Sequence, residues 1–201
     1  MASSFVAELN INLLPAITLV LIWLDIREDE AHDPASRLFL VLVWLLIGML
    51  VLEPFTWLFD GASPRYAPFL YLSNILFLMM GVFSIYLWFA YVCHKTNPRL
   101  VVACGRLPRL LIILPALLVS VLIVVLPGQS GVFYIDDANR YQRGALYLLP
   151  YAVSVLYLLM CGVVSIYTLA RGASGETRRL ARCLSFTLIP PVLALTVQSR
   201  F

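Results

Sequence analysis

Long apolar runs alternate with short polar connections along the whole chain. Six of these runs approach or exceed the ~20 residues that an α-helix needs to cross a bilayer. Because a helix satisfies its own backbone hydrogen bonds in lipid, each run is expected to be helical. The predicted helices cover about residues 8–26, 38–59, 68–93, 108–126, 145–170 and 180–198. The pattern therefore predicts an all-α fold, a six-helix polytopic transmembrane bundle that forms a single domain over residues 1–201.

Composition supports a lipid environment. Apolar residues make up 62% of the 201 residues and charged residues only 12%, against roughly a quarter charged in soluble domains. A soluble fold of this size could not bury so large an apolar excess in its core. We therefore expect the lipid bilayer to be the main partner of this chain.

Cations gather in alternate connections, and this distribution predicts the orientation. They follow the first, third and fifth predicted helices, at Arg27, Arg37, Lys95, Arg99, Arg106, Arg109, Arg171, Arg178, Arg179 and Arg182. Positive connections stay in the cytoplasm, so we expect a multi-pass protein of the cytoplasmic membrane with its N-terminus outside. Since the sequence ends soon after the sixth run, we expect a fragment that lacks a seventh helix and a cytoplasmic domain; a complete six-helix protein is the alternative.

The longest external connection, residues 127–144, predicts a short hairpin. Two β-prone stretches flank Asp136 and Asp137, which are turn-forming residues. The hairpin is expected to lie over the helix bundle as a lid. Asn139, Arg140 and Arg143 either contact a ligand there or only fix the hairpin and the helix that follows it.

Four polar side chains inside the predicted helices are candidates for ligand binding. Glu53 is the most informative, because a charged group in a bilayer is costly; it lines an outward-open cavity or is an acid near the interface that reaches water. Tyr71 and Asn74 are expected at a similar depth. Tyr151 shares a helical face with Tyr147 and belongs either to a pocket between helices or to an interfacial aromatic belt.

No catalytic motif is recognisable. The sequence contains no nucleophile elbow, Gly-rich phosphate loop or HExxH, and its histidines and cysteines lack metal-ligand spacing. The sequence has no basic stripe interleaved with aromatic residues, the pattern that would favour nucleic-acid binding. We expect no enzyme activity, no cofactor, no metal and no nucleic-acid partner.

Two phrases carry a resemblance to a known family. The segments LYLSNILFLMM and VFYIDDANRYQRGALYLLPY, together with the predicted N-out arrangement, resemble the N-terminal seven-helix membrane sensor region of bacterial GGDEF diguanylate cyclases and of some sensor histidine kinases. The resemblance implies a sensor of a small extracytoplasmic ligand that signals to a cytoplasmic output domain and dimerises through it. The seventh helix and the output domain are not in this sequence.

The expected function is therefore that of a membrane-embedded sensory module in bacterial signal transduction. Two alternatives come from other classes. A small transporter or permease would be favoured by helix breaks that repeat in the two halves of the chain, and none is evident. A structural membrane subunit stays open, because lipid-facing and partner-facing apolar surfaces look alike in sequence.

Overall fold

The computed structural model describes residues 2–29, 33–97, 106–126, 128–170 and 175–186. Within these ranges the chain forms six α-helices, one 3-10 turn and one two-stranded sheet. In chain order they are α1 Ala2–Asp29, α2 Pro34–Phe59, η1 Pro64–Tyr66, α3 Ala67–Thr96, α5 Arg106–Val125, β1 Phe133–Ile135, β2 Tyr141–Arg143, α6 Leu148–Ala170 and α7 Gly175–Phe186. The helical character of the prediction is confirmed.

Three helices in the described part are long and apolar enough to cross a membrane. They span Pro34–Phe59, Pro64–Thr96 and Leu148–Ala170. The apolar stretches Ile11–Asp25 of α1 and Leu110–Val125 of α5 are shorter. The sixth predicted helix, 180–198, overlaps α7, which begins at Gly175. Residues 187–198 of the predicted helix lie outside the described residues. A crossing number of six therefore stays a prediction.

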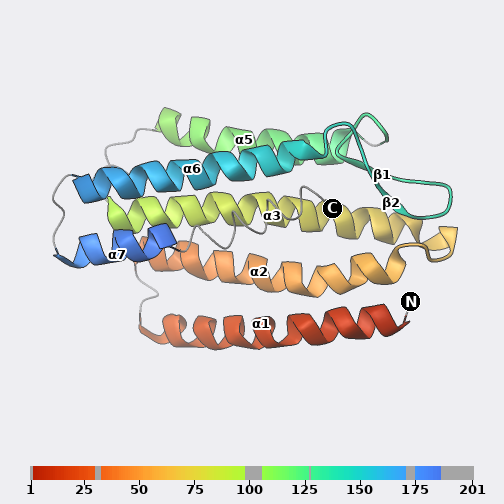
Figure 1. Cartoon of the computed structure of the whole chain (residues 1–201), viewed down its shortest axis with the longest axis horizontal. Helices are drawn as coiled ribbons and strands as arrows, with labels where there is room; N and C mark the ends of the chain where they lie inside the picture. Colours follow the sequence, from red (N-terminus) through yellow and green to blue (C-terminus); the bar gives the residue numbers. More distant parts are fainter. Residues whose placement is uncertain (1, 30–32, 98–105, 127, 171–174, 187–201) are drawn as a thin grey trace.

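The helices lie side by side, with α3 at the centre (Figure 1). Helices α2 and α6 pack on α3, α1 packs on α2, and α5 contacts both α3 and α6. Figure 1 shows the hairpin at the end of the bundle where α2 leads into α3, and α7 at the opposite end. The connections thus separate into a hairpin end and an α7 end.

The core contains side chains from α3, α5, α6 and the hairpin. Val82 and Phe89 of α3 meet Val119 of α5 and Tyr157 of α6 in one buried cluster, and Phe133 of β1 joins it. The Tyr157 hydroxyl donates to the Ile112 carbonyl at 2.7 Å. This bond joins α6 to α5 through a polar group that would otherwise be unsatisfied.

Apolar side chains also cover the outside of the bundle. On α6, Leu159, Val163 and Ile166 follow a helical stripe and are 63%, 67% and 66% exposed. A soluble protein rarely leaves such a continuous stripe in water, whereas in lipid it is the expected surface. This exposure agrees with membrane localisation.

Several buried hydroxyl groups in the helices bond back to their own helix. Thr96 donates to the Val92 carbonyl at 2.7 Å, Ser120 to Ala116 at 2.8 Å and Thr168 to Val164 at 2.8 Å. Such bonds satisfy a hydroxyl without a partner helix. These polar residues therefore need no ligand to explain them.

The α7 end is closed by an ion pair between two chain segments. Asp33 precedes α2, and its side chain accepts from the Ala35 N–H at 3.4 Å as an N-cap. Lys95 at the end of α3 lies 2.9 Å from the same carboxylate. The Lys95 ammonium, more than the backbone N–H of Ala35, holds the pKa of Asp33 below its ordinary value.

The chain forms a hairpin in the predicted connection, while its position outside the membrane stays a prediction. Strands β1 and β2 pair antiparallel, with Tyr134 opposite Gln142. Because Ala145 and Leu146 donate back to Gln129 at 2.8 Å and Gly131 at 2.9 Å, residues 145–147 complete the hairpin base. Helix α6 therefore begins at Leu148, three residues after the predicted start.

Gly144 is the position where the hairpin base has no room for a side chain. A Cβ atom there would collide with the Gly131 carbonyl. We predict that Gly144→Ala lowers the free energy of unfolding by about 1–3 kcal/mol, as overpacking does elsewhere. Thermal unfolding in detergent measures this. Gly175→Ala is the control, since a Cβ there meets open space; equal loss in both variants would contradict the tight hairpin base.

Candidate ligand-binding site

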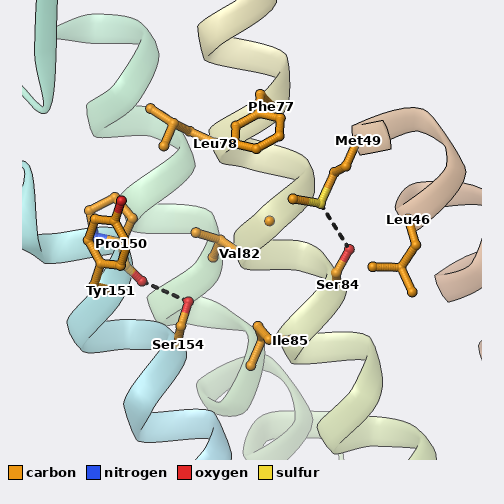
Figure 2. Close-up of a pocket in the computed structure, with 11 residues that line it drawn as sticks. Leu46, Met49, Phe77, Leu78, Val82, Ser84, Ile85, Pro150, Tyr151 and Ser154 are labelled. Carbon is orange, nitrogen blue, oxygen red and sulfur yellow. Dashed lines mark hydrogen bonds between the residues drawn. The ribbon is translucent and has the colours of Figure 1, made fainter. Parts of the chain in front are cut away.

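A partly open cavity of about 200 Å³ lies on α3, between α2 and α6. Figure 2 shows the side chains that surround it, with α2 on one side and α6 on the other. Its lining residues are Leu46, Met49, Phe77, Leu78, Gly81, Val82, Ser84, Ile85, Pro150, Tyr151 and Ser154. Its volume suits a small molecule.

A glycine of α3 and a proline of α6 border this space. Gly81 of α3 has no side chain to occupy it, and a Cβ there would lie 3.6 Å from Met49 Cε. Pro150 stands in the first turn of α6, where its missing N–H leaves no helical hydrogen bond unmade. The missing side chain at Gly81 therefore contributes to the cavity, and a larger residue there would reduce its volume.

The cavity is almost wholly apolar. No charged side chain lines it, and its polar groups are three hydroxyls. The Ser154 hydroxyl already donates to the Pro150 carbonyl at 2.9 Å, and the Ser84 hydroxyl lies 3.9 Å from Met49 Sδ. The arrangement fits an uncharged, mainly apolar molecule better than an ion or a sugar.

Tyr151 is the one predicted site residue that lines this cavity. Its side chain is half-buried on α6. Of the two interpretations of Tyr151, a place beside a pocket between helices agrees with the structure.

Asn74 and Tyr71 lie on α3 but do not line the cavity. The Asn74 amide is 8% exposed and donates to the Leu70 carbonyl of its own helix at 2.8 Å. The Tyr71 ring packs against Phe133 of the hairpin, with ring centroids 5.2 Å apart. Asn74 is bonded within α3, and Tyr71 connects α3 to the hairpin.

Glu53 contacts the first helix. Its carboxylate accepts from the Asn12 amide at 3.0 Å, and the same amide donates to the Leu50 carbonyl at 3.2 Å. Glu53 therefore joins α2 to α1, and it is absent from the cavity lining. Sequence reasoning missed Asn12 because a single amide within an apolar run gives no sign of its partner.

Asn139 fixes the hairpin to the connection between α2 and α3. It is 1% exposed, and its φ of 57° is a left-handed conformation that asparagine tolerates. Its amide donates to the carbonyls of Phe59 at 2.9 Å and Ala62 at 3.1 Å, and its own carbonyl accepts from Gly61 at 2.7 Å. The Tyr141 N–H adds a bond to the Asp60 carboxylate at 2.7 Å. We call this set of bonds the hairpin clasp.

Arg140 and Arg143 are exposed on the hairpin. The Arg143 guanidinium lies 5.1 Å from the Tyr147 ring centre. The Arg140 N–H donates to the Asp136 carboxylate at 2.9 Å, and this bond, with one from Gln142, holds the pKa of Asp136 below its ordinary value. In this structure both arginines stabilise or flank the hairpin and lie outside the cavity lining.

A chain of aromatic contacts leads from α3 to both strands of the hairpin. The Phe133 ring packs on Tyr71 at 5.2 Å and on Tyr141 at 5.5 Å. Burial, together with the charge that the neighbouring Tyr151 would carry, raises the pKa of Tyr141 to about 12. The rings of Tyr71, Phe133 and Tyr141 therefore join α3 to the hairpin.

No group of three or more His, Cys, Asp or Glu side chains able to hold a metal ion occurs in the ranges described above. No known protein family, no curated protein and no solved structure matches this chain. The site must therefore be interpreted from its own geometry.

The clasp gives a direct test of what Asn139 does. We predict that Asn139→Ala lowers the free energy of unfolding by about 2–3 kcal/mol, because two buried carbonyls lose their donor and alanine is strained at positive φ. Chemical unfolding in detergent, followed by circular dichroism, measures the change.

Asn139→Gly separates the two causes, since glycine removes the donor and keeps the backbone conformation. The free energy of unfolding of Asn139→Gly should therefore be about 1–2 kcal/mol higher than that of Asn139→Ala. Ala138→Gly, at the exposed neighbouring position, is the control for the turn. Wild-type stability of Asn139→Ala would contradict the clasp.

Proposed function

We propose that this chain is the membrane-embedded sensory module of a bacterial signalling protein, and that its ligand is a small, uncharged, mainly apolar molecule. The observation that carries the proposal is the cavity on α3, which no charged side chain lines. A polar ligand bound near Glu53 is less well supported, because that carboxylate already accepts from Asn12 at 3.0 Å.

The contacts at the cavity suggest how binding would be reported. Tyr151 lines the cavity from the first turn of α6, and α6 follows directly after the hairpin base at residues 145–147. A ligand changes the balance of two conformations only if it binds one of them better than the other. We infer that an occupied cavity moves Tyr151 and shifts the hairpin relative to the α2–α3 connection.

The orientation and the output belong to the same proposal. The hairpin end would face outside and the α7 end the cytoplasm, in keeping with the arginines at the α7 end. By the family resemblance, the signal would reach a diguanylate cyclase or kinase domain through further helices, and the output domain would dimerise. This chain would itself perform no catalysis.

The cavity is tested with a photoreactive octanol that carries a diazirine. In the wild type we expect adducts on Met49 and Tyr151, found by mass spectrometry, that excess octanol prevents. Gly81→Leu should fill the cavity and lower this labelling at least about tenfold, the effect of losing ~1.4 kcal/mol of contact. Val155→Leu on the exposed face of α6 is the matched control. Adducts that are confined to exposed positions would contradict the site.

Sensing itself is tested by a distance between the two ends. Spin labels are placed on Cys183, which is exposed, and on Ala138→Cys in the hairpin, in a Cys104→Ser background. Octanol should change the distance distribution in the wild type and leave it unchanged in Gly81→Leu. Labelled octanol that enters the cavity without any change in distance would contradict a sensor, and uptake of a solute into vesicles would favour a transporter.

A further inference from the structure

Helix α7 presents arginines on one face and packs with the other. Ala181 is completely buried, while Arg178, Arg179 and Arg182 are exposed. The helix contacts α6 and α3 at the end of the bundle opposite the hairpin (Figure 1). Its packing therefore holds three guanidinium groups outward beside the membrane-crossing helices.

The ion pair described at this end of the bundle does not involve these arginines. Lys95 at the same end is paired with Asp33 at 2.9 Å. Among the side chains that the structure describes, no carboxylate forms an ion pair with Arg178, Arg179 or Arg182; the side chain of Glu176 is outside that set. Three exposed guanidinium groups on one short helix form a strongly cationic surface that attracts anions.

We propose that α7 binds the phosphate groups of anionic phospholipids at the membrane surface. The three arginines lie at the end of the bundle where α6 ends (Figure 1). Long basic side chains beside membrane-crossing helices would reach the boundary between headgroups and acyl chains. The guanidinium fork matches a phosphate with two parallel hydrogen bonds, and the long side chains reach the surface from within the boundary.

The position of α7 favours a lipid over other anions. It packs on α6 and α3, which are long and apolar enough to cross a membrane. Its exposed arginines would therefore lie beside lipid headgroups, whose phosphates carry the complementary charge. Each cation near an anionic surface strengthens association about fivefold, so three together give a marked preference for anionic lipid.

The test measures lipid binding by the purified full chain in dodecyl maltoside. Native mass spectrometry counts retained phosphatidylglycerol and phosphatidylcholine, and thermal unfolding follows the same additions. We expect phosphatidylglycerol to bind and to raise the melting temperature, and phosphatidylcholine to do neither. Replacing Arg178, Arg179 and Arg182 together by Gln should weaken phosphatidylglycerol binding at least about tenfold.

Two comparisons make the result specific. Gln at Arg65, Arg140 and Arg143, three exposed arginines at the hairpin end, should leave phosphatidylglycerol binding unchanged. Lys at the three α7 positions should restore part of the binding, because charge is kept and the fork is lost. Inorganic phosphate at the same concentration should have no effect on the melting temperature.

Unaltered phosphatidylglycerol binding in the α7 triple variant would overturn the proposal, as would an equal loss in the hairpin-end variant. A full response to inorganic phosphate would also overturn it, since the site would then bind free phosphate. The proposal does not depend on the ligand of the cavity. Failure of octanol labelling would leave it intact.

Discussion

Polar groups inside hydrocarbon need a partner within the protein, and this requirement shapes most of the structure; Trp88 Nε1 and Ser165 Oγ are buried exceptions among the described helical side chains. Unsatisfied backbone groups in lipid cost several kcal/mol each, and the bundle meets the requirement at several levels. Buried hydroxyls such as Ser120 bond to their own helix, and the Tyr157 hydroxyl joins α6 to α5. The Asn12 amide donates a hydrogen bond to the Glu53 carboxylate. A cavity without charged groups is what such a core leaves for a ligand. The apolar chemistry proposed for that ligand thus follows from the same requirement as the fold.

The hairpin end obeys a different rule, because irregular backbone can be satisfied there by specific contacts. Asn139 satisfies two carbonyls beyond the end of α2, and Tyr141 donates to Asp60 while its ring packs on Phe133. These bonds hold together the connection of two helices that flank the cavity. In the proposed mechanism, a movement of Tyr151 in the first turn of α6 would reach the hairpin base next to it, and the hairpin is bonded to the α2–α3 connection. At the opposite end the ion pair between Asp33 and Lys95 joins the start of α2 to the end of α3, and the arginines of α7 are exposed.

Sequence reasoning succeeds here where a single physical signal decides the outcome. Apolar runs predict the helices, and turn-forming residues between β-prone stretches predict the hairpin that β1 and β2 form. Tyr151 was selected by its helical face, and it does line the cavity. Glu53 was interpreted by its cost in lipid alone, since the sequence does not reveal that Asn12, 41 residues away, supplies its partner. Gly81 and Met49 could not be selected, because a cavity arises from the fit of helices that are distant in sequence, and apolar residues that line a cavity look like any others.

The central claim is that the hairpin and α7 lie on opposite sides of a membrane that the helices cross. It is tested most directly with a membrane-impermeant maleimide applied to cells that produce Ala138→Cys in a Cys104→Ser background. Both Ala138 and Cys183 are exposed, while Cys93 and Cys161 are buried. The account predicts that intact cells are labelled in the hairpin alone, and that Cys183 reacts only after the membrane is opened. Labelling of both positions from the same side would contradict it.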